Sequence, residues 1–363
     1  MIRIADPTFG PDEQEAVRAV LEDGMVADGP TVRQFESDFA AYCGTDEAVA
    51  TANGTAALQI ALEALGIGNG DRVVTTPFSF VASANAVRLA GATPVFADID
   101  PETYNLDPES AREAVRAADA DALLVVHLYG LPAEMDAFVD IAADEDVVLV
   151  EDAAQAHGAR YRGDSVGTFG DAAAFSFYPT KNMTTGEGGM VLTDRAKVAE
   201  RAASLVNHGR GDGGTYAHER VGHNLRMTSM AAAIGRVQLE KLPRWVRARR
   251  QNARLLSERL ADVPGITVPH EPAEARHSYH QFTVRHAVRD RLAERLESAG
   301  VGSNVYYPTL IPHLEAYEEY DVSIPTAERA AETVLSLPVH PGLSGDDIDH
   351  IGSAVRNAVQ QPL

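Results

Sequence analysis

The feature that most limits the fold of this 363-residue chain is the alternation of short β-branched runs with helical segments between residues 45 and 195. Strands that alternate with helices in this way form βαβ units, in which helices cover both faces of a parallel sheet. The sequence therefore predicts an α/β fold with a mostly parallel central sheet flanked by helices. The expected strands are 48–51, 72–75, 94–97, 122–126 and 147–150, and the expected helices are 55–65, 80–90, 108–118 and 134–144.

The pattern changes near residue 240. Residues 238–260 are predicted to form one long arginine-rich helix, interrupted near Pro243, and a mixed α/β segment follows it. We therefore expect a large domain at 1–240 and a smaller C-terminal α/β domain at 241–363.

The charge of the chain excludes several partners. There are 53 acidic and 31 basic residues, a net charge of −22, and the acidic residues are spread along the sequence. Nucleic acids and anionic membranes need a basic surface, so neither is an expected partner. The chain shows no apolar run of about 18 residues and no signal-peptide pattern, which predicts a cytoplasmic protein. The acidity suggests a halophilic host with a salty cytoplasm, and an ordinary acidic cytosolic protein is the alternative.

One of only three lysines lies in an unusual local sequence. A strand is expected to end at Ser176, and a turn with Lys181 and the glycine-rich segment 186–189 follows it. A protected lysine at a strand end is where pyridoxal 5'-phosphate (PLP) enzymes form their Schiff base with the cofactor. The hydroxyl of Ser176 is a candidate ligand of the cofactor phosphate. The alternative is a surface lysine in a flexible loop.

A carboxylate follows the strand predicted at 147–150. Asp152 is expected at the C-terminal end of this strand, where ligands of open α/β sheets bind. A PLP enzyme needs one carboxylate that faces the pyridine nitrogen, and Asp152 fits that role. Glu151 should point to the opposite side of the strand. The alternative for Asp152 is a carboxylate that caps a following helix.

Two further segments suit a flat, phosphate-bearing cofactor. The strand at 48–51 runs into a helix through a small-residue turn, so the helix N-terminus at Gly54 and Thr55 can bind an anion. An ordinary helix cap would look the same. Phe78 and Phe80 lie just past the strand at 72–75, and either ring can stack on the cofactor or belong to the core.

Several of these segments occur in the order typical of one family. The blocks are 29–30 with 35–36, 53–58, 151–158, 176–181 with 186–189, 222–227 and 336–341. In these blocks the chain resembles the DegT/StrS family of PLP-dependent sugar aminotransferases, which have the fold type I, aspartate aminotransferase-like architecture.

The resemblance implies a role for each matching residue. Lys181 would form the Schiff base, and Asp152 would face the pyridinium. Phe80 would stack on the ring, and Gln155 would approach the phenolic oxygen of the cofactor. Gly54, Thr55 and Ser176 would hold the phosphate. Asn224 would reach the cofactor phosphate of a neighbouring subunit, which implies a homodimer with shared active sites. Thr309 and His313 lie in a region similar to the substrate-facing loop of the family.

The reaction implied by the resemblance has two halves. An amino-acid donor, usually glutamate in this family, gives its amino group to the cofactor, and a keto sugar, typically linked to a nucleoside diphosphate, then accepts it. The freed amine of Lys181 would serve as base and acid. One branch of the family dehydrates sugars and carries histidine in place of the lysine, so Lys181 argues against that dehydratase reading.

Other functions have weaker support. A dinucleotide-binding oxidoreductase needs a glycine loop after its first strand, whereas 209–214 follows the expected sheet and 66–70 follows a helix as a C-cap turn. No metal site is predicted, because the closest histidines, His277 and His280, have no acidic ligand at a familiar spacing and are expected at the surface or in a substrate loop. A non-catalytic PLP-binding regulator remains an alternative, and turnover of an amino donor would distinguish it.

Overall fold

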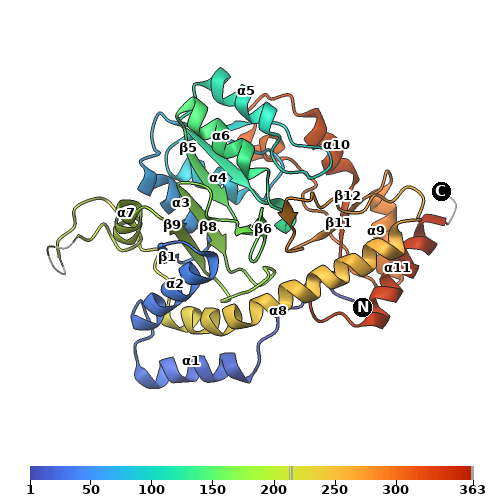
Figure 1. Ribbon diagram of the computed structural model, residues 1–363, viewed down its shortest axis with the longest axis horizontal. Coiled ribbons are helices and arrows are strands. Elements are labelled where there is room, and N and C mark those ends of the chain that lie inside the picture. Colours follow the sequence, from blue (N-terminus) through green and yellow to red (C-terminus); the bar gives the residue numbers. More distant parts are fainter. Residues whose placement is uncertain (212, 214–215, 361–363) are drawn as a thin grey trace.

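The computed structural model of the chain describes residues 1–211, 213 and 216–360. Within them, seven strands form the central sheet in the order β1-β9-β8-β5-β4-β2-β3. β1, β9, β8 and β5 are labelled in Figure 1. These strands are β1 (Glu47–Thr51), β2 (Arg72–Thr75), β3 (Thr93–Phe96), β4 (Ala122–Val126), β5 (Val148–Asp152), β8 (Ala172–Ser176) and β9 (Gly189–Thr193). The expected α/β architecture is confirmed, and every predicted strand lies within two residues of an observed one.

The sheet departs from the predicted pattern at one strand. β9 runs antiparallel to both of its neighbours, β1 and β8, and the sequence analysis placed no strand there. The other neighbouring pairs, from β8 through β5, β4 and β2 to β3, are parallel. The sheet is therefore mostly parallel, as predicted.

Helices cover both faces of the sheet. One face packs against α3 (Gly54–Leu65), α4 (Ala82–Leu89) and α7 (Ala196–Val206). The other face packs against α5 (Pro108–Ala118) and α6 (Met135–Glu145), and on its β8–β9 side against α2 (Pro30–Cys43). Successive residues of β4 alternate between these layers, because Leu124 belongs to the α3 side and Leu123 and Val125 to the α5 side.

The long helix α8 differs from its prediction. It spans Ser229–Leu260, begins nine residues earlier than expected and continues through Pro243. Leu242 and Val246, on either side of the proline, are both buried in the core that α8 shares with α2. Tertiary packing thus holds the helix together across the position where proline removes a backbone hydrogen bond. The expected interruption is wrong.

A second core surrounds the C-terminal half of α8. It contains the two-stranded sheet of β11 (Phe282–Arg285) and β12 (Val334–Leu337), together with α9 (Arg289–Ser298) and α11 (Gly345–Gln360). The expected boundary at residue 240 falls inside α8, which contributes to both cores (Figure 1). The division into domains 1–240 and 241–363 stays a prediction.

Smaller elements complete the described chain. They are α1 (Pro11–Asp23), α10 (Pro325–Thr333), the three-stranded sheet of β10 (Ala275–Arg276), β6 (Arg160–Tyr161) and β7 (Asp164–Ser165), and the short helices η1 (Leu128–Gly130), η2 (Ile311–His313) and η3 (Glu315–Tyr317). None of the helices described is both long enough and apolar enough to cross a membrane.

Candidate active site

A cavity of about 800 Å³ opens at the carboxyl ends of β5 and β8, beside the N-terminus of α3. Seven of the residues predicted for cofactor binding line it: Gly54, Thr55, Phe80, Asp152, Gln155, Ser176 and Lys181. They come from four separate segments of the chain, 54–55, 80, 152–155 and 176–181, which the fold brings together.

Lys181 presents an unpartnered amine to this cavity. It lies in the turn after β8, where its backbone N–H donates to the carbonyl oxygen of Tyr178 at 2.9 Å. Among the described residues its Nζ has neither a hydrogen bond nor an ion pair. Burial lowers the pKa of Lys181 to about 8, although the nearby carboxylate of Asp152 raises it. About a tenth of this amine is therefore neutral and nucleophilic at pH 7, far more than for an ordinary lysine.

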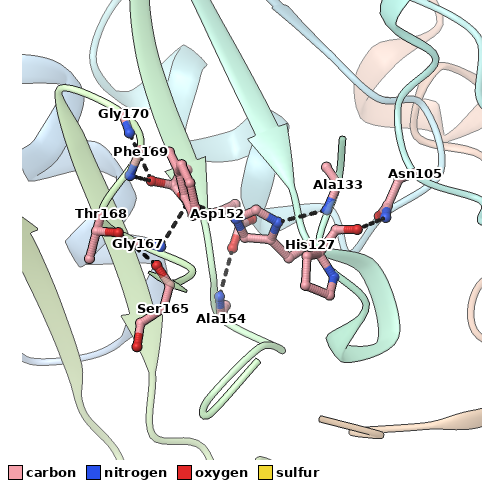
Figure 2. Close-up of polar contacts among 12 residues, drawn as sticks. Asn105, His127, Ala133, Asp152, Ala154, Ser165, Gly167, Thr168, Phe169 and Gly170 are labelled. Carbon is pink, nitrogen blue, oxygen red and sulfur yellow. Dashed lines mark hydrogen bonds and ion pairs between the residues drawn. The ribbon is translucent and has the colours of Figure 1, made fainter. Parts of the chain in front are cut away.

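Asp152 is fixed at the end of β5 with its carboxylate in the cavity. Ser83 Oγ on α4 donates to Oδ2 at 2.8 Å. The N–H of Ala154 donates to Oδ1 at 3.1 Å (Figure 2). Burial raises the pKa of Asp152, whereas these two hydrogen bonds and the charge of Lys181 lower it. A cationic ring nitrogen placed against this carboxylate would lower its pKa further.

Glu151 points away from Asp152, as predicted from the alternation along a strand. Its carboxylate is fully buried and accepts the backbone N–H groups of Gly167, Phe169 and Gly170 at 2.7 to 2.8 Å. His127 Nε2 lies 2.9 Å from the same carboxylate (Figure 2). The Nδ1 of His127 accepts the N–H of Ala133, so Nε2 carries the proton and donates it to Glu151. Glu151 is thus an anchor on the far side of the strand that carries Asp152.

The N-terminus of α3 forms an amide cradle next to Ser176. Asn53 Oδ1 caps the helix by accepting the N–H of Ala56 at 2.9 Å. The N–H groups of Gly54 and Thr55 have no partner among the described residues. A Cβ at position 54 would lie 2.5 Å from Ser176 Cβ, so glycine is needed for this close approach. Two free amides and a serine hydroxyl at a helix N-terminus are suited to a phosphate.

Gln155 and Phe80 occupy other parts of the wall. Gln155 Oε1 accepts the N–H of Tyr129 at 2.8 Å, and its Nε2 donates to the hydroxyl of Tyr307 at 3.1 Å. Phe80 is 55% exposed and lines the cavity, whereas Phe78 is fully buried in the core. Of the two phenylalanines left open by the sequence, only Phe80 is therefore placed to stack on a ligand.

The geometry fits PLP. The cofactor needs an uncharged amine for its aldehyde, a carboxylate for its ring nitrogen and an anion site for its phosphate. Lys181, Asp152 and the amide cradle of α3 supply these three groups around one cavity.

Three predicted residues lie outside the cavity. Asn224, Thr309 and His313 are exposed and do not line it. Asn224 follows α7 in an isolated β-bridge with Asn207. His313 Nε2 lies 3.9 Å from a carboxylate oxygen of Glu328. The role of Asn224 in a neighbouring subunit and the substrate roles of Thr309 and His313 stay predictions.

The histidines expected at the surface or in a substrate loop are placed differently. His277 and His280 are both buried, and His280 lines the cavity together with Gln281. The surface expectation is wrong, because backbone hydrogen bonds from Ser278 and Gln281 hold this segment against Gly130 and Tyr129. No group of three or more potential metal ligands of the His, Cys, Asp and Glu types occurs in the described part of the chain. In the glycine-rich stretch 209–214, Asp212 and Gly214 lie outside the described residues.

Three residues that were not predicted from the sequence also support or line the site. Ser83 holds Asp152, Tyr307 holds Gln155, and Glu187 lines the cavity. Glu187 lies inside the glycine-rich segment 186–189 that was predicted to follow Lys181. Its place in that segment could have indicated that it belongs to the site. The contacts of Ser83 and Tyr307 join residues 69 and 152 positions apart, and no local pattern indicates them.

The model of the DegT/DnrJ/EryC1/StrS aminotransferase family matches residues 7–356. The chain belongs to this family. Aminotransferases of this family depend on PLP. The resemblance to DegT/StrS proteins and the PLP requirement inferred from the sequence are thereby confirmed.

Individual relatives cover nearly the whole chain. It is 41% identical over 345 residues to the dTDP-3-amino-3,4,6-trideoxy-alpha-D-glucose transaminase of Streptomyces venezuelae, with 94% of this chain and 90% of the relative covered. It is 39% identical over 349 residues to a pleiotropic regulatory protein of Geobacillus stearothermophilus, with 94% and 92% covered. The solved structure of S. venezuelae DesV in complex with a ketimine intermediate has a TM-score of 0.93 and 40% identity, and covers 96% of this chain and 95% of its own.

Proposed function

We propose that this member of the family transfers an amino group from an amino acid, with glutamate as the first candidate, to a keto sugar linked to a nucleoside diphosphate. The observation that carries the proposal is the unpartnered amine of Lys181 in the same cavity as the carboxylate of Asp152. The Streptomyces relative, whose name specifies a dTDP-linked amino sugar, supports this class of acceptor.

Each cavity residue has a proposed task toward PLP. Lys181 would bind the cofactor covalently, Asp152 would hold its ring nitrogen, and Gln155 would face its phenolic oxygen. Phe80 would cover the ring. Gly54, Thr55 and Ser176 would hold the phosphate. When bound, PLP supplies an electron sink for the carbon that loses its proton.

The side chains then move the proton. With a pKa of about 8, the Lys181 amine can accept a proton from substrate and return it at a neighbouring atom near neutral pH. Ser83 and Ala154 fix the Asp152 carboxylate, so it does not have to reorganise during the reaction. A cavity of about 800 Å³ is large enough for a cofactor and part of a sugar nucleotide.

The wider setting of the protein is also proposed. The exposed position of Asn224 supports a homodimer in which this residue enters the neighbouring cavity. The net charge of −22 supports a cytoplasmic protein of a halophilic host, with no nucleic-acid partner. The dehydratase alternative is disfavoured by Lys181. Turnover of an amino donor tests the alternative that the protein is a non-catalytic PLP-binding regulator.

A spectroscopic experiment tests the aminotransferase reaction directly. The PLP-loaded protein, purified in high salt, is expected to lose its visible cofactor band when glutamate is added and to regain it when a keto sugar nucleotide is added. If no amino acid changes the band, the protein binds PLP for another purpose and the regulator reading replaces this proposal. If added PLP never produces a band, the assignment of Lys181 is wrong.

Asp152→Asn is expected to lower the rate of transamination about 10²-fold, the scale of losing one preorganised electrostatic partner. The amide keeps the shape of the side chain but cannot hold a cationic ring nitrogen. The rate of the glutamate half-reaction measures the effect. Asp146→Asn, at an exposed position just before β5, is the matched control and should retain the wild-type rate. Equal rates in the two variants would exclude Asp152 from this role.

A further inference from the structure

A second pocket lies between the loop after β3 and the small C-terminal core. It has a volume of about 310 Å³ and is formed by four segments: the loop after β3, the loop after α8, the end of β11 and one side of α10. Its polar lining includes two arginines, a histidine, a tyrosine and several threonines. None of its described lining residues carries a carboxylate.

The charge of this pocket is opposite to that of the chain. Arg285 and Arg329 both line it, in a protein with 53 acidic and 31 basic residues. The Arg285 guanidinium donates to the carbonyl oxygen of Pro101 at 3.0 Å and has no carboxylate partner among the described residues. The exposed Arg329 side chain has no hydrogen bond or ion pair within that part of the chain. Two cations without counter-ions therefore share one concavity.

Neutral donors complete the lining. Tyr104 is only 7% exposed, yet its hydroxyl has no hydrogen-bond partner in the described chain. Burial raises the pKa of Tyr104 to about 12, while Arg285 lowers it and Asp100 raises it, so the phenol stays protonated and can donate. His286 Nδ1 accepts the N–H of Val288, which leaves Nε2 to carry the proton. Nε2 lies toward Gly265, another lining residue.

Two carboxylates in the loop after β3 already have hydrogen-bond partners. Asp98 accepts the backbone N–H groups of Thr326 and Ala327, each at 2.9 Å, at the start of α10. Asp100 accepts the N–H groups of Glu102 and Thr103 and the hydroxyl of Thr103. These bonds hold both carboxylates in the loop instead of in ion pairs with the two arginines. Local hydrogen bonding thus keeps Asp98 and Asp100 from neutralising the two arginines.

We propose that this pocket binds the phosphate group of a small phosphorylated metabolite, at a site separate from the PLP cavity. Arg285 and Arg329 supply the fork-shaped donors that match phosphate oxygens, and Tyr104 and His286 supply the neutral donors. A volume of about 310 Å³ accommodates a sugar phosphate but not a whole sugar nucleotide. A bound anion would contact Tyr104 in the loop after β3 and Arg285 at the end of β11. It would thus connect the central sheet to the C-terminal core.

Calorimetric titration of the PLP-loaded protein tests the site, because bound PLP keeps the amide cradle of α3 occupied. The probes are inorganic phosphate and hexose 1-phosphate, each compared with potassium chloride at equal ionic strength. We expect saturable binding of one equivalent per chain, tighter for the hexose phosphate, and a rise in Tm of about 2 °C at saturation.

The decisive comparison uses two double variants with the same change of charge. Arg285→Gln/Arg329→Gln removes both guanidinium groups from the pocket, and Arg244→Gln/Arg291→Gln removes two exposed arginines elsewhere. Binding should weaken at least tenfold in the first variant and stay at the wild-type value in the second. Equal binding in the two variants, or no phosphate binding by the wild-type protein, overturns the proposal. Tighter binding of inorganic phosphate than of the ester would identify free phosphate as the ligand. These readouts do not depend on transamination.

Discussion

Lys181→Ala is expected to abolish transamination, with a rate at least about 10⁴-fold below that of the wild-type protein. The substitution removes the amine that would bind PLP covalently, and it also removes the group that would move the proton. Because no other lysine lines the cavity of the described chain, no neighbouring amine can substitute. The glutamate half-reaction, followed by the visible band of PLP, measures the loss.

The control and the pH dependence make this prediction specific. Lys197→Ala, at an exposed position on α7, should retain full activity. The wild-type apoprotein should attach PLP at a rate that falls about tenfold for each pH unit below 8 and levels off above it, because only the neutral amine attacks the aldehyde and burial lowers the pKa of Lys181 to about 8. An active Lys181→Ala protein, or attachment that stays constant down to pH 6, would contradict the assignment.

The predicted residues that the structure places around the cavity share a local cause. Asp152, Ser176 and the N-terminus of α3 at Gly54 all lie at or just after the ends of strands of the central sheet. β5 is a mainly apolar run that contains valines, and β8 is an alanine-rich run that ends at Ser176. In a mostly parallel sheet such ends gather at one edge, so the strand pattern alone indicates that these residues meet. Phe80 and Gln155 depended on the family resemblance as well.

The features that the sequence missed depend on distant contacts. β9 begins at a glycine and contains five residues, and its place between β1 and β8 is fixed by pairing with both strands. Ser83 reaches the site from α4, and Tyr307 reaches it from the loop between α9 and η2. His280 is buried because backbone hydrogen bonds hold its segment against Tyr129 and Gly130. None of these contacts leaves a periodic signal in the local sequence.

Glu151→Ala is expected to lower the free energy of unfolding by at least about 3 kcal/mol, because it removes one partner of a fully buried charged network. Three backbone N–H groups, from Gly167, Phe169 and Gly170, would lose their acceptor in the interior. His127 would lose the acceptor of its Nε2 proton. Guanidinium unfolding of the PLP-free protein measures this change without reference to catalysis.

Two further variants separate charge from packing at this anchor. Glu151→Gln keeps the volume but exchanges one acceptor oxygen for an NH₂ group, so at least one buried N–H remains unpaired and the expected loss is about 1–3 kcal/mol. Glu200→Gln, an exposed substitution on α7, should change stability by no more than about 0.5 kcal/mol. The backbone N–H of His127 donates to the carbonyl oxygen of Asp152 at 3.0 Å. A loosened anchor should therefore displace Asp152 and weaken PLP binding in Glu151→Gln. Wild-type stability together with wild-type PLP affinity in that variant would show that the network neither supports the fold nor positions Asp152.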